Sequence, residues 1–148
     1  MACNIFFVIS TSYFLISKKH DGLVSPITKT QNLPESLQTN KQRMVLFDSI
    51  VNFYNNKDIA GLYNLFDDML KVKYDLEEFK TIVQKMYDLS GTINKGAFTH
   101  YEWGKNEYFR EFTLCYLIKT NQGEMKLRVI IRQQGEEKYR ILGFKINS

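Results

Sequence analysis

His100 is the residue of this chain that could act in acid–base chemistry. The chain has two histidines, and His100 is the one in the predicted folded part, next to Tyr101 and close to Trp103. A histidine can serve as a general base at neutral pH because its ordinary pKa lies close to that pH. The alternative is an ordinary polar residue at the surface of a β-strand. His100 is therefore a catalytic candidate, and no catalytic residue is assigned.

The carboxylates near His100 in the sequence do not form a pair at a defined spacing. Most lie beside predicted turns, where a charged side chain is simply exposed to solvent. Glu111 lies within a strand next to Arg110. The glutamates concerned are Glu102, Glu107, Glu111, Glu124, Glu136 and Glu137. The sequence thus predicts no pair of carboxylates for acid–base catalysis.

A metal site is not predicted either. The folded part has one histidine and one cysteine, Cys115, and shows no close cluster of ligands in the sequence. Neither a glycine-rich phosphate loop nor a Ser–His–acid arrangement occurs, and no cofactor is expected. The other cysteine, Cys3, lies near the N-terminus, and two cysteines are too few for a disulfide framework. Cys115 is interpreted as a small buried residue of a strand.

Aromatic side chains are the candidates for ligand binding. They make up 14% of the chain, and tyrosine and tryptophan combine apolar surface with a polar tip, which suits pockets and interfaces. The alternative is that these rings belong to the hydrophobic core. The predicted ligand-binding residues are Tyr54, Tyr63, Tyr101, Trp103 and Tyr116.

The charge of the chain does not indicate a nucleic-acid partner. Its formal net charge is +4, but the basic residues are spread out and mixed with glutamate in the C-terminal half. Nucleic-acid binders usually gather their lysines and arginines into a patch or stripe. The close basic pairs are Lys18 with Lys19, Lys41 with Arg43, and Lys71 with Lys73. We therefore expect solvated faces rather than a phosphate-binding track.

Three regions follow one another along the chain. Residues 1–17 contain the apolar run 5–16, which has the length of a signal-peptide core and is too short for a typical membrane span. Its basic cluster follows the run instead of preceding it, so both a signal and an anchor stay open, as does a loosely packed strand. Residues 18–38 form a polar linker that holds both prolines. We expect an exported or membrane-tethered protein whose folded domain covers residues 39–148.

Three helices are expected at the start of this domain. Thr39, Asp58 and Asp75 are the predicted N-cap residues, because their side chains can accept hydrogen bonds from free amides of the first turn. Gln42 and Glu78 stand three residues after the first and third caps, which is the spacing of a capping box. Apolar residues then recur at helical spacing in each segment, and Gly91 is expected to end the third helix.

Four strands follow, because the apolar period changes from 3.6 to 2 after Gly91. The expected strands are 93–103, 108–119, 125–132 and 139–146, with a bulge at Leu142 and Gly143. Short turns between them predict an antiparallel meander, and helices before strands predict an α+β domain. The second strand is apolar on both faces, so the face away from the helices needs a partner, a ligand or the protein's own tail.

The helical and C-terminal segments resemble a known group. The runs 53–71 (FYNNKDIAGLYNLFDDMLK), 74–93 (YDLEEFKTIVQKMYDLSGTI) and 139–146 (YRILGFKI) are similar to small bacterial members, of unknown function, of the nuclear-transport-factor-2-like superfamily. The resemblance covers residues 41–148. It implies a cystatin-like cone, in which a curved sheet wraps a helix and leaves a pocket at its wide end. Because only residues 71–74 link the second and third helices, a deep, closed pocket is not expected.

Two functions are considered beside a third possibility, a purely structural domain of a larger envelope assembly, which predicts no cavity and a broad exposed apolar face. The first is a non-catalytic binding or interaction domain at the cell envelope, which holds a small apolar ligand or a peptide, or pairs with a second copy through its sheet. The alternative is an isomerase or dehydratase with His100 as base and Tyr54 or Tyr116 as hydrogen-bond donor. The enzyme requires His100 to point into a closed polar cavity, and this requirement separates the two functions.

Overall fold

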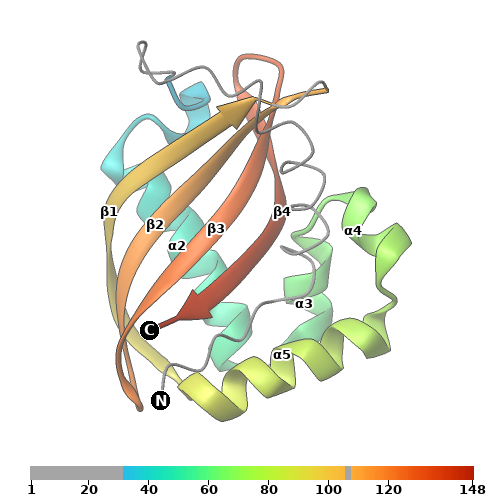
Figure 1. Cartoon of the computed structure of the whole chain (residues 1–148), viewed down its shortest axis with the longest axis vertical. Coiled ribbons are helices and arrows are strands. Elements are labelled where there is room, and N and C mark those ends of the chain that lie inside the picture. Colours follow the sequence, from blue (N-terminus) through green and yellow to red (C-terminus); the bar gives the residue numbers. More distant parts are fainter. Residues whose placement is uncertain (1–31, 106–107) are drawn as a thin grey trace.

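The computed structural model of the chain describes residues 32–105 and 108–148. Within this part, helices precede a four-stranded sheet (Figure 1), which confirms the predicted α+β class. The elements are η2 (Glu35–Leu37), α2 (Asn40–Asn55), α3 (Ile59–Asn64), α4 (Asp68–Lys73), α5 (Leu76–Ser90), β1 (Ile93–Lys105), β2 (Arg110–Thr120), β3 (Gly123–Gln134) and β4 (Lys138–Asn147). The predicted signal-like or anchor segment and the linker up to residue 31 lie outside the described residues.

The predicted helix caps are confirmed. The Thr39 hydroxyl accepts a hydrogen bond from the Gln42 amide at 3.2 Å, and the Gln42 side chain accepts one from the Thr39 amide at 3.0 Å. Asp75 and Glu78 form the same capping box at the start of α5. These bonds satisfy amides that have no partner within the helix, so each helix begins where its cap residue stands.

The second predicted helix is divided into α3 and α4. The chain leaves the helix after Asn64, and Phe66 forms a parallel β-bridge with Ile141 of β4. The Asp67 amide donates to the carbonyl of Ile141 at 2.8 Å, while the Asp67 side chain caps α4 through the amide of Met69. Aspartate favours such local bonds over a helix interior, and here the sheet edge supplies a further partner.

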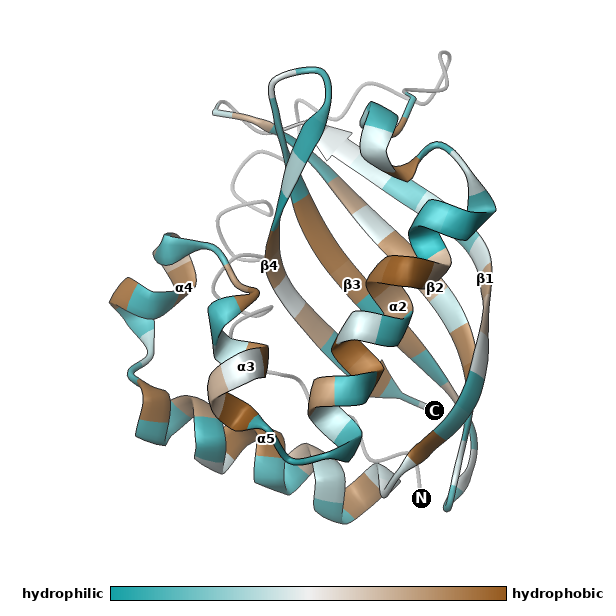
Figure 2. Ribbon diagram, turned by 180° about the vertical axis from the view of Figure 1, so that it is seen from behind, coloured by the Kyte–Doolittle hydropathy of each residue, from teal (hydrophilic) through white to brown (hydrophobic). Residues whose placement is uncertain are grey.

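The sheet is an antiparallel meander in the order β1–β2–β3–β4. Its strands curve in front of α2 in Figure 1, while α3, α4 and α5 lie beside the β4 edge and across one end. Figure 2 shows α2 lying across the sheet, with hydrophobic stretches on the helix and on the strands behind it. The largest fully buried side chains are Tyr54, Tyr116, Phe79, Phe112, Phe144, Leu37, Ile50, Leu62, Met86, Leu114 and Ile118.

Three register shifts interrupt the ladder. Ile130 pairs with Gly143 but Ile131 pairs with Ile141, so Leu142 is the extra residue and the bulge predicted there is confirmed. The other two shifts, which the sequence did not predict, lie in β1, between Ile93 and Lys95 and between Phe98 and His100. A bulge bends its strand and re-aims side chains, and the bulge between Phe98 and His100 shapes the site described below.

The core extends into the predicted linker. Leu33 and Leu37 are 4% and 0% exposed and belong to the core cluster, although the sequence assigned them to a polar tether. Backbone amides of Glu35 and Ser36 donate to carbonyls of the turn between β3 and β4. Two leucines in a polar stretch create no periodic pattern, so their burial could be found only from the tertiary structure. None of the helices in the described part is long and apolar enough to span a membrane.

Candidate functional site

Two of the predicted ligand-binding tyrosines lie in the core. Tyr54 is 0% exposed, and its hydroxyl is 2.7 Å from that of Ser90. Tyr116 is 1% exposed, and its hydroxyl donates to the carbonyl of Arg43 at 2.9 Å. Burial raises the pKa of Tyr54 to about 12 and raises the pKa of Tyr116 as well. Neither side chain has free surface to offer a ligand, and both bonds tie helices to the rest of the domain.

The other three predicted residues are half-buried and do not share one pocket. The Tyr63 hydroxyl donates to the carbonyl of Tyr74 at 2.6 Å and so joins α3 to the end of α4. Tyr101 lines a hollow of about 290 Å³ together with Leu33 and Arg43. Trp103 packs against the core, and its indole nitrogen is buried without a hydrogen-bond partner. The chain's own Leu33 therefore lines the same hollow as Tyr101, one of the predicted ligand-binding residues.

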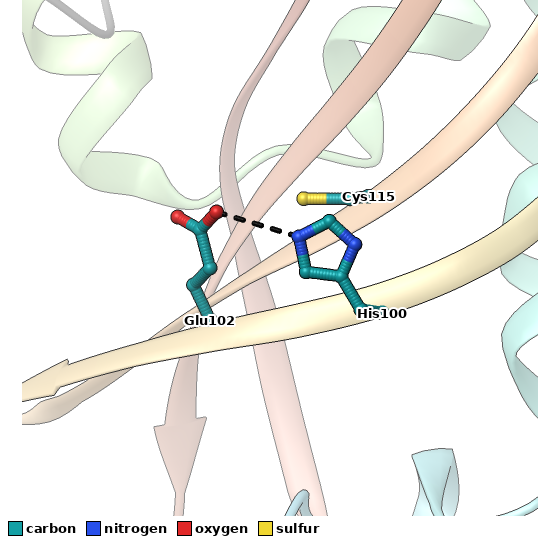
Figure 3. Close-up of side chains that lie close together, drawn as sticks. All are labelled: His100, Glu102 and Cys115. Carbon is teal, nitrogen blue, oxygen red and sulfur yellow. Dashed lines mark hydrogen bonds and ion pairs between the residues drawn. The ribbon is translucent and has the colours of Figure 1, made fainter. Parts of the chain in front are cut away.

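His100, Glu102 and Cys115 come together on the face of the sheet that is turned away from the helices. His100 pairs with Cys115 across β1 and β2, and Glu102 lies two residues along on the same face (Figure 3). One potential ligand atom from each residue lies within 4.8 Å of the other two. His100 Nε2 is 3.4 Å from Glu102 Oε1, and these side chains are 57% and 54% exposed, while Cys115 is 5% exposed.

The bulge between Phe98 and His100 of β1 organises this cluster. The register shift places Thr99 and His100 against the single residue Cys115. The Thr99 hydroxyl donates to the Cys115 carbonyl at 3.0 Å and is also 3.0 Å from His100 Nδ1. Thr99 thus connects the two strands and fixes the imidazole at one of its two nitrogens.

The charges around the cluster act on its thiol. Burial raises the pKa of Cys115, and the nearby Glu102 carboxylate raises it further, while Arg128, Lys145 and Lys126 oppose this shift. Burial lowers the pKa of Lys145, and repulsion from Arg128 lowers it further by a smaller amount. Because its pKa is raised, Cys115 is protonated at neutral pH and is not prepared as a nucleophile.

This cluster could not be predicted from the sequence. His100 and Cys115 are fifteen positions apart, and they meet only because the β1–β2 hairpin pairs them. The bulge after Phe98 shifts the register by one residue, and without this shift His100 would not oppose Cys115. The available signal was the presence of a histidine and a cysteine in two adjacent predicted strands, which does not by itself set the register.

A separate cleft of about 680 Å³ opens between α2 and β4. Leu46 and Ile141, both buried, form part of its floor, and Lys41 and Arg140 lie at its margin. The complete lining is Ser36, Thr39, Lys41, Gln42, Val45, Leu46, Ser49, Leu65, Tyr139, Arg140 and Ile141. None of these was predicted as a site residue, because they come from four segments of the chain.

Comparisons with known proteins give little further information. Neither a protein-family profile nor a curated protein sequence matches the chain. Among solved structures, the chain is similar to one titled "Structure of Bdellovibrio bacteriovorus Bd1075", with 12% identity and a TM-score of 0.41. The similarity covers 72% of this chain and 40% of that one, so the chain spans less than half the length of that protein.

Proposed function

We propose that this protein is a non-catalytic binding domain of the cystatin-like cone type, and that it holds a small amphipathic anion in the cleft between α2 and β4. The observation that carries the proposal is the composition of this cleft, which combines an apolar floor with a cationic margin. Its volume of about 680 Å³ lies within the range of small-molecule sites.

The apolar part of the cleft is a surface that a ligand can cover. Val45 is 58% exposed on α2, although it lies next to the buried Leu46. Leu65 and Ile141 extend this apolar surface from α3 to β4. Covering such side chains with the apolar part of a ligand removes them from water, which favours binding.

The margin of the cleft favours a negative charge. Lys41 and Arg140 form no ion pair with another described residue, and Arg140 donates a hydrogen bond to the side chain of Gln134 at 3.1 Å. Thr39, Lys41 and Gln42 form the N-terminal end of α2, where the helix dipole is positive. A carboxylate or sulfonate placed here would meet both side-chain cations and the helix end.

The positions of the candidate catalytic residues favour binding over catalysis. His100 is mostly exposed on the outer face of the sheet, whereas Tyr54 of α2 and Tyr116 of β2 are buried in the core between the sheet and the helices. A base and a hydrogen-bond donor on opposite sides of a sheet cannot act on one substrate. The isomerase-type alternative therefore has no assembled site among the described residues.

A fluorescent anionic amphiphile, anilinonaphthalene sulfonate, tests this proposal on the full-length chain. We expect saturable binding, and we expect Lys41→Gln with Arg140→Gln to weaken it roughly tenfold, since each exposed cation contributes about 0.7 kcal/mol. Lys85→Gln with Lys119→Gln changes the net charge equally at exposed positions outside the cleft and is the matched control. Equal affinities of the two double variants would refute the cleft.

Native mass spectrometry of the gently purified chain adds an independent test. A monomer that carries a small acidic molecule supports the proposal, and a dimer without added mass points instead to pairing through the sheet. Location at the cell envelope, expected from residues 5–16, is part of the same proposal. Fractionation of host cells tests it, because a chain recovered with the cytosol would contradict it.

A further inference from the structure

We propose that His100, Glu102 and Cys115 form a binding site for a divalent transition-metal ion of the zinc type. The site lies on the outer face of the sheet, and it does not depend on the function proposed for the cleft on the helical side. It brings together three residues that the sequence analysis treated as unrelated.

The donor atoms match this class of metal. An imidazole nitrogen, a thiolate sulfur and a carboxylate oxygen are all common zinc ligands, and three protein ligands leave a fourth position for water. Bond lengths of about 2.0–2.3 Å require ligand atoms roughly 3.3–3.8 Å apart. His100 Nε2 and Glu102 Oε1 are already 3.4 Å apart, and all three ligand atoms lie within 4.8 Å. Small rotations of the two exposed side chains close the remaining gap.

The hydrogen bonds of Thr99 select the correct form of the imidazole. Its single hydroxyl proton is directed to the Cys115 carbonyl, so towards His100 Nδ1 the hydroxyl can only accept. The proton of a neutral imidazole is then on Nδ1, and the lone pair is on Nε2. Nε2 faces the Glu102 carboxylate, and two lone pairs in this position repel each other unless a proton or a cation lies between them. Metal-binding histidines commonly have their second nitrogen held in this way.

The backbone that carries the three ligands is also held rigidly by the sheet. Cys115 is buried in the middle of β2, and the bulge at Thr99 fixes the direction of His100 relative to it. Bulges are frequent beside functional sites because they re-aim one side chain without disturbing the sheet. Only the two exposed ligands therefore lose freedom when the metal binds.

Binding of the metal ion releases one proton from the site. The metal ion replaces the thiol proton of Cys115, a sulfur–metal bond forms, and one proton passes to the solvent. The thiolate and the carboxylate together balance the double positive charge of the ion. Arg128 and Lys145 lie close enough to act on the thiol, and their positive charges oppose the binding of a cation.

Cobalt(II) is a suitable probe because its bond to a thiolate produces a charge-transfer absorption in the near ultraviolet. The untagged full-length chain is titrated with Co²⁺, and Zn²⁺ is then added to displace it. We expect one Co²⁺ per chain and a thiolate band that Zn²⁺ removes. Cys115→Ala should abolish the band, and His100→Gln should weaken binding at least tenfold.

The chain supplies its own controls. Cys3→Ser and His20→Gln remove the other cysteine and the other histidine, and they should leave Co²⁺ binding unchanged. Thr99→Val removes the partner of His100 Nδ1 and should weaken binding about tenfold. Since Cys115 is buried, near-ultraviolet circular dichroism verifies folding of its variant, and the exposed His100→Gln variant supplies a test that does not depend on that site. Absence of the band from the unmodified chain, its loss in Cys3→Ser, or its survival in Cys115→Ala would overturn the proposal.

Discussion

Gly96 allows α2 to pack directly against β1, and replacing it is the most direct test of this fold. Gly96 pairs with Ile118 and faces the core. A Cβ atom at this position would lie 2.4 Å from Cζ and 2.7 Å from Cε2 of Phe47, and 3.0 Å from Cγ2 of Ile118. Phe47 is 3% exposed and packs on the ring of Tyr116, so it cannot simply turn aside. We therefore expect Gly96→Ala to force α2 away from the strand.

The size of the effect follows from the overlap. Carbon atoms pack at about 3.5–4.0 Å, so the Phe47 ring has to move by more than about 1 Å. Overpacking of this kind costs about 1–3 kcal/mol in the free energy of unfolding. Urea denaturation, followed by the fluorescence of Trp103, measures this loss. With an m value of about 2 kcal/mol/M, a loss of about 2 kcal/mol lowers the midpoint by about 1 M.

Gly104→Ala is the matched control in the same strand. Its Cβ would meet no atom within 4 Å, and its φ lies outside the left-handed region. Alanine there restricts the unfolded chain, so we expect no loss, or a gain of up to about 0.5 kcal/mol. Phe47→Leu in the Gly96→Ala background should recover part of the loss, because it removes the clashing atoms. If Gly96→Ala is as stable as Gly104→Ala, the packing of α2 on β1 is not as described.

Three further changes test other parts of the structure. Asp67 caps α4 and accepts two bonds of 2.8 Å from Arg132, so Asp67→Ala should cost about 3 kcal/mol in urea denaturation. Asp67→Asn, which retains an acceptor oxygen, should cost less, and the reverse order would contradict this role. Tyr54 is protonated in the folded chain up to its raised pKa of about 12 but ionises at about 10.0 when unfolded, so stability should fall as the pH rises between these values. Tyr54→Phe should show a shallower fall in pH-dependent denaturation, and an unchanged slope would argue against burial of the hydroxyl. Thr39→Ala should lower the free energy of unfolding by about 1 kcal/mol, and no loss on denaturation would show that the capping box does not contribute.

Much of the fold could be predicted because its signals are local. The caps at Thr39, Asp58 and Asp75 depend on side chains and amides no more than three residues apart. The strands follow from alternation over a few residues, and the Leu142 bulge follows from one slip in that alternation. The division between α3 and α4 was missed, since it depends on the bridge from Phe66 to Ile141, seventy-five positions away.

The candidate sites could not be predicted from such local signals. The aromatic residues were predicted to bind a ligand because of their residue type, and only packing decided that Tyr54 and Tyr116 are in the core. The cleft combines α2, η2, the end of α3 and β4, and no pattern within any one of these segments predicts its partners.

The sequence by itself determined that helices precede strands, where most of these elements begin, and that the sheet is an antiparallel meander. The physical reason is that caps, turns and apolar periodicity act within a few residues along the chain. The tertiary structure alone decided that Leu33 and Leu37 complete the core and that His100 opposes Cys115. These outcomes depend on strand register and on packing between distant segments, and a shift of one residue at Thr99 is enough to create or remove the cluster.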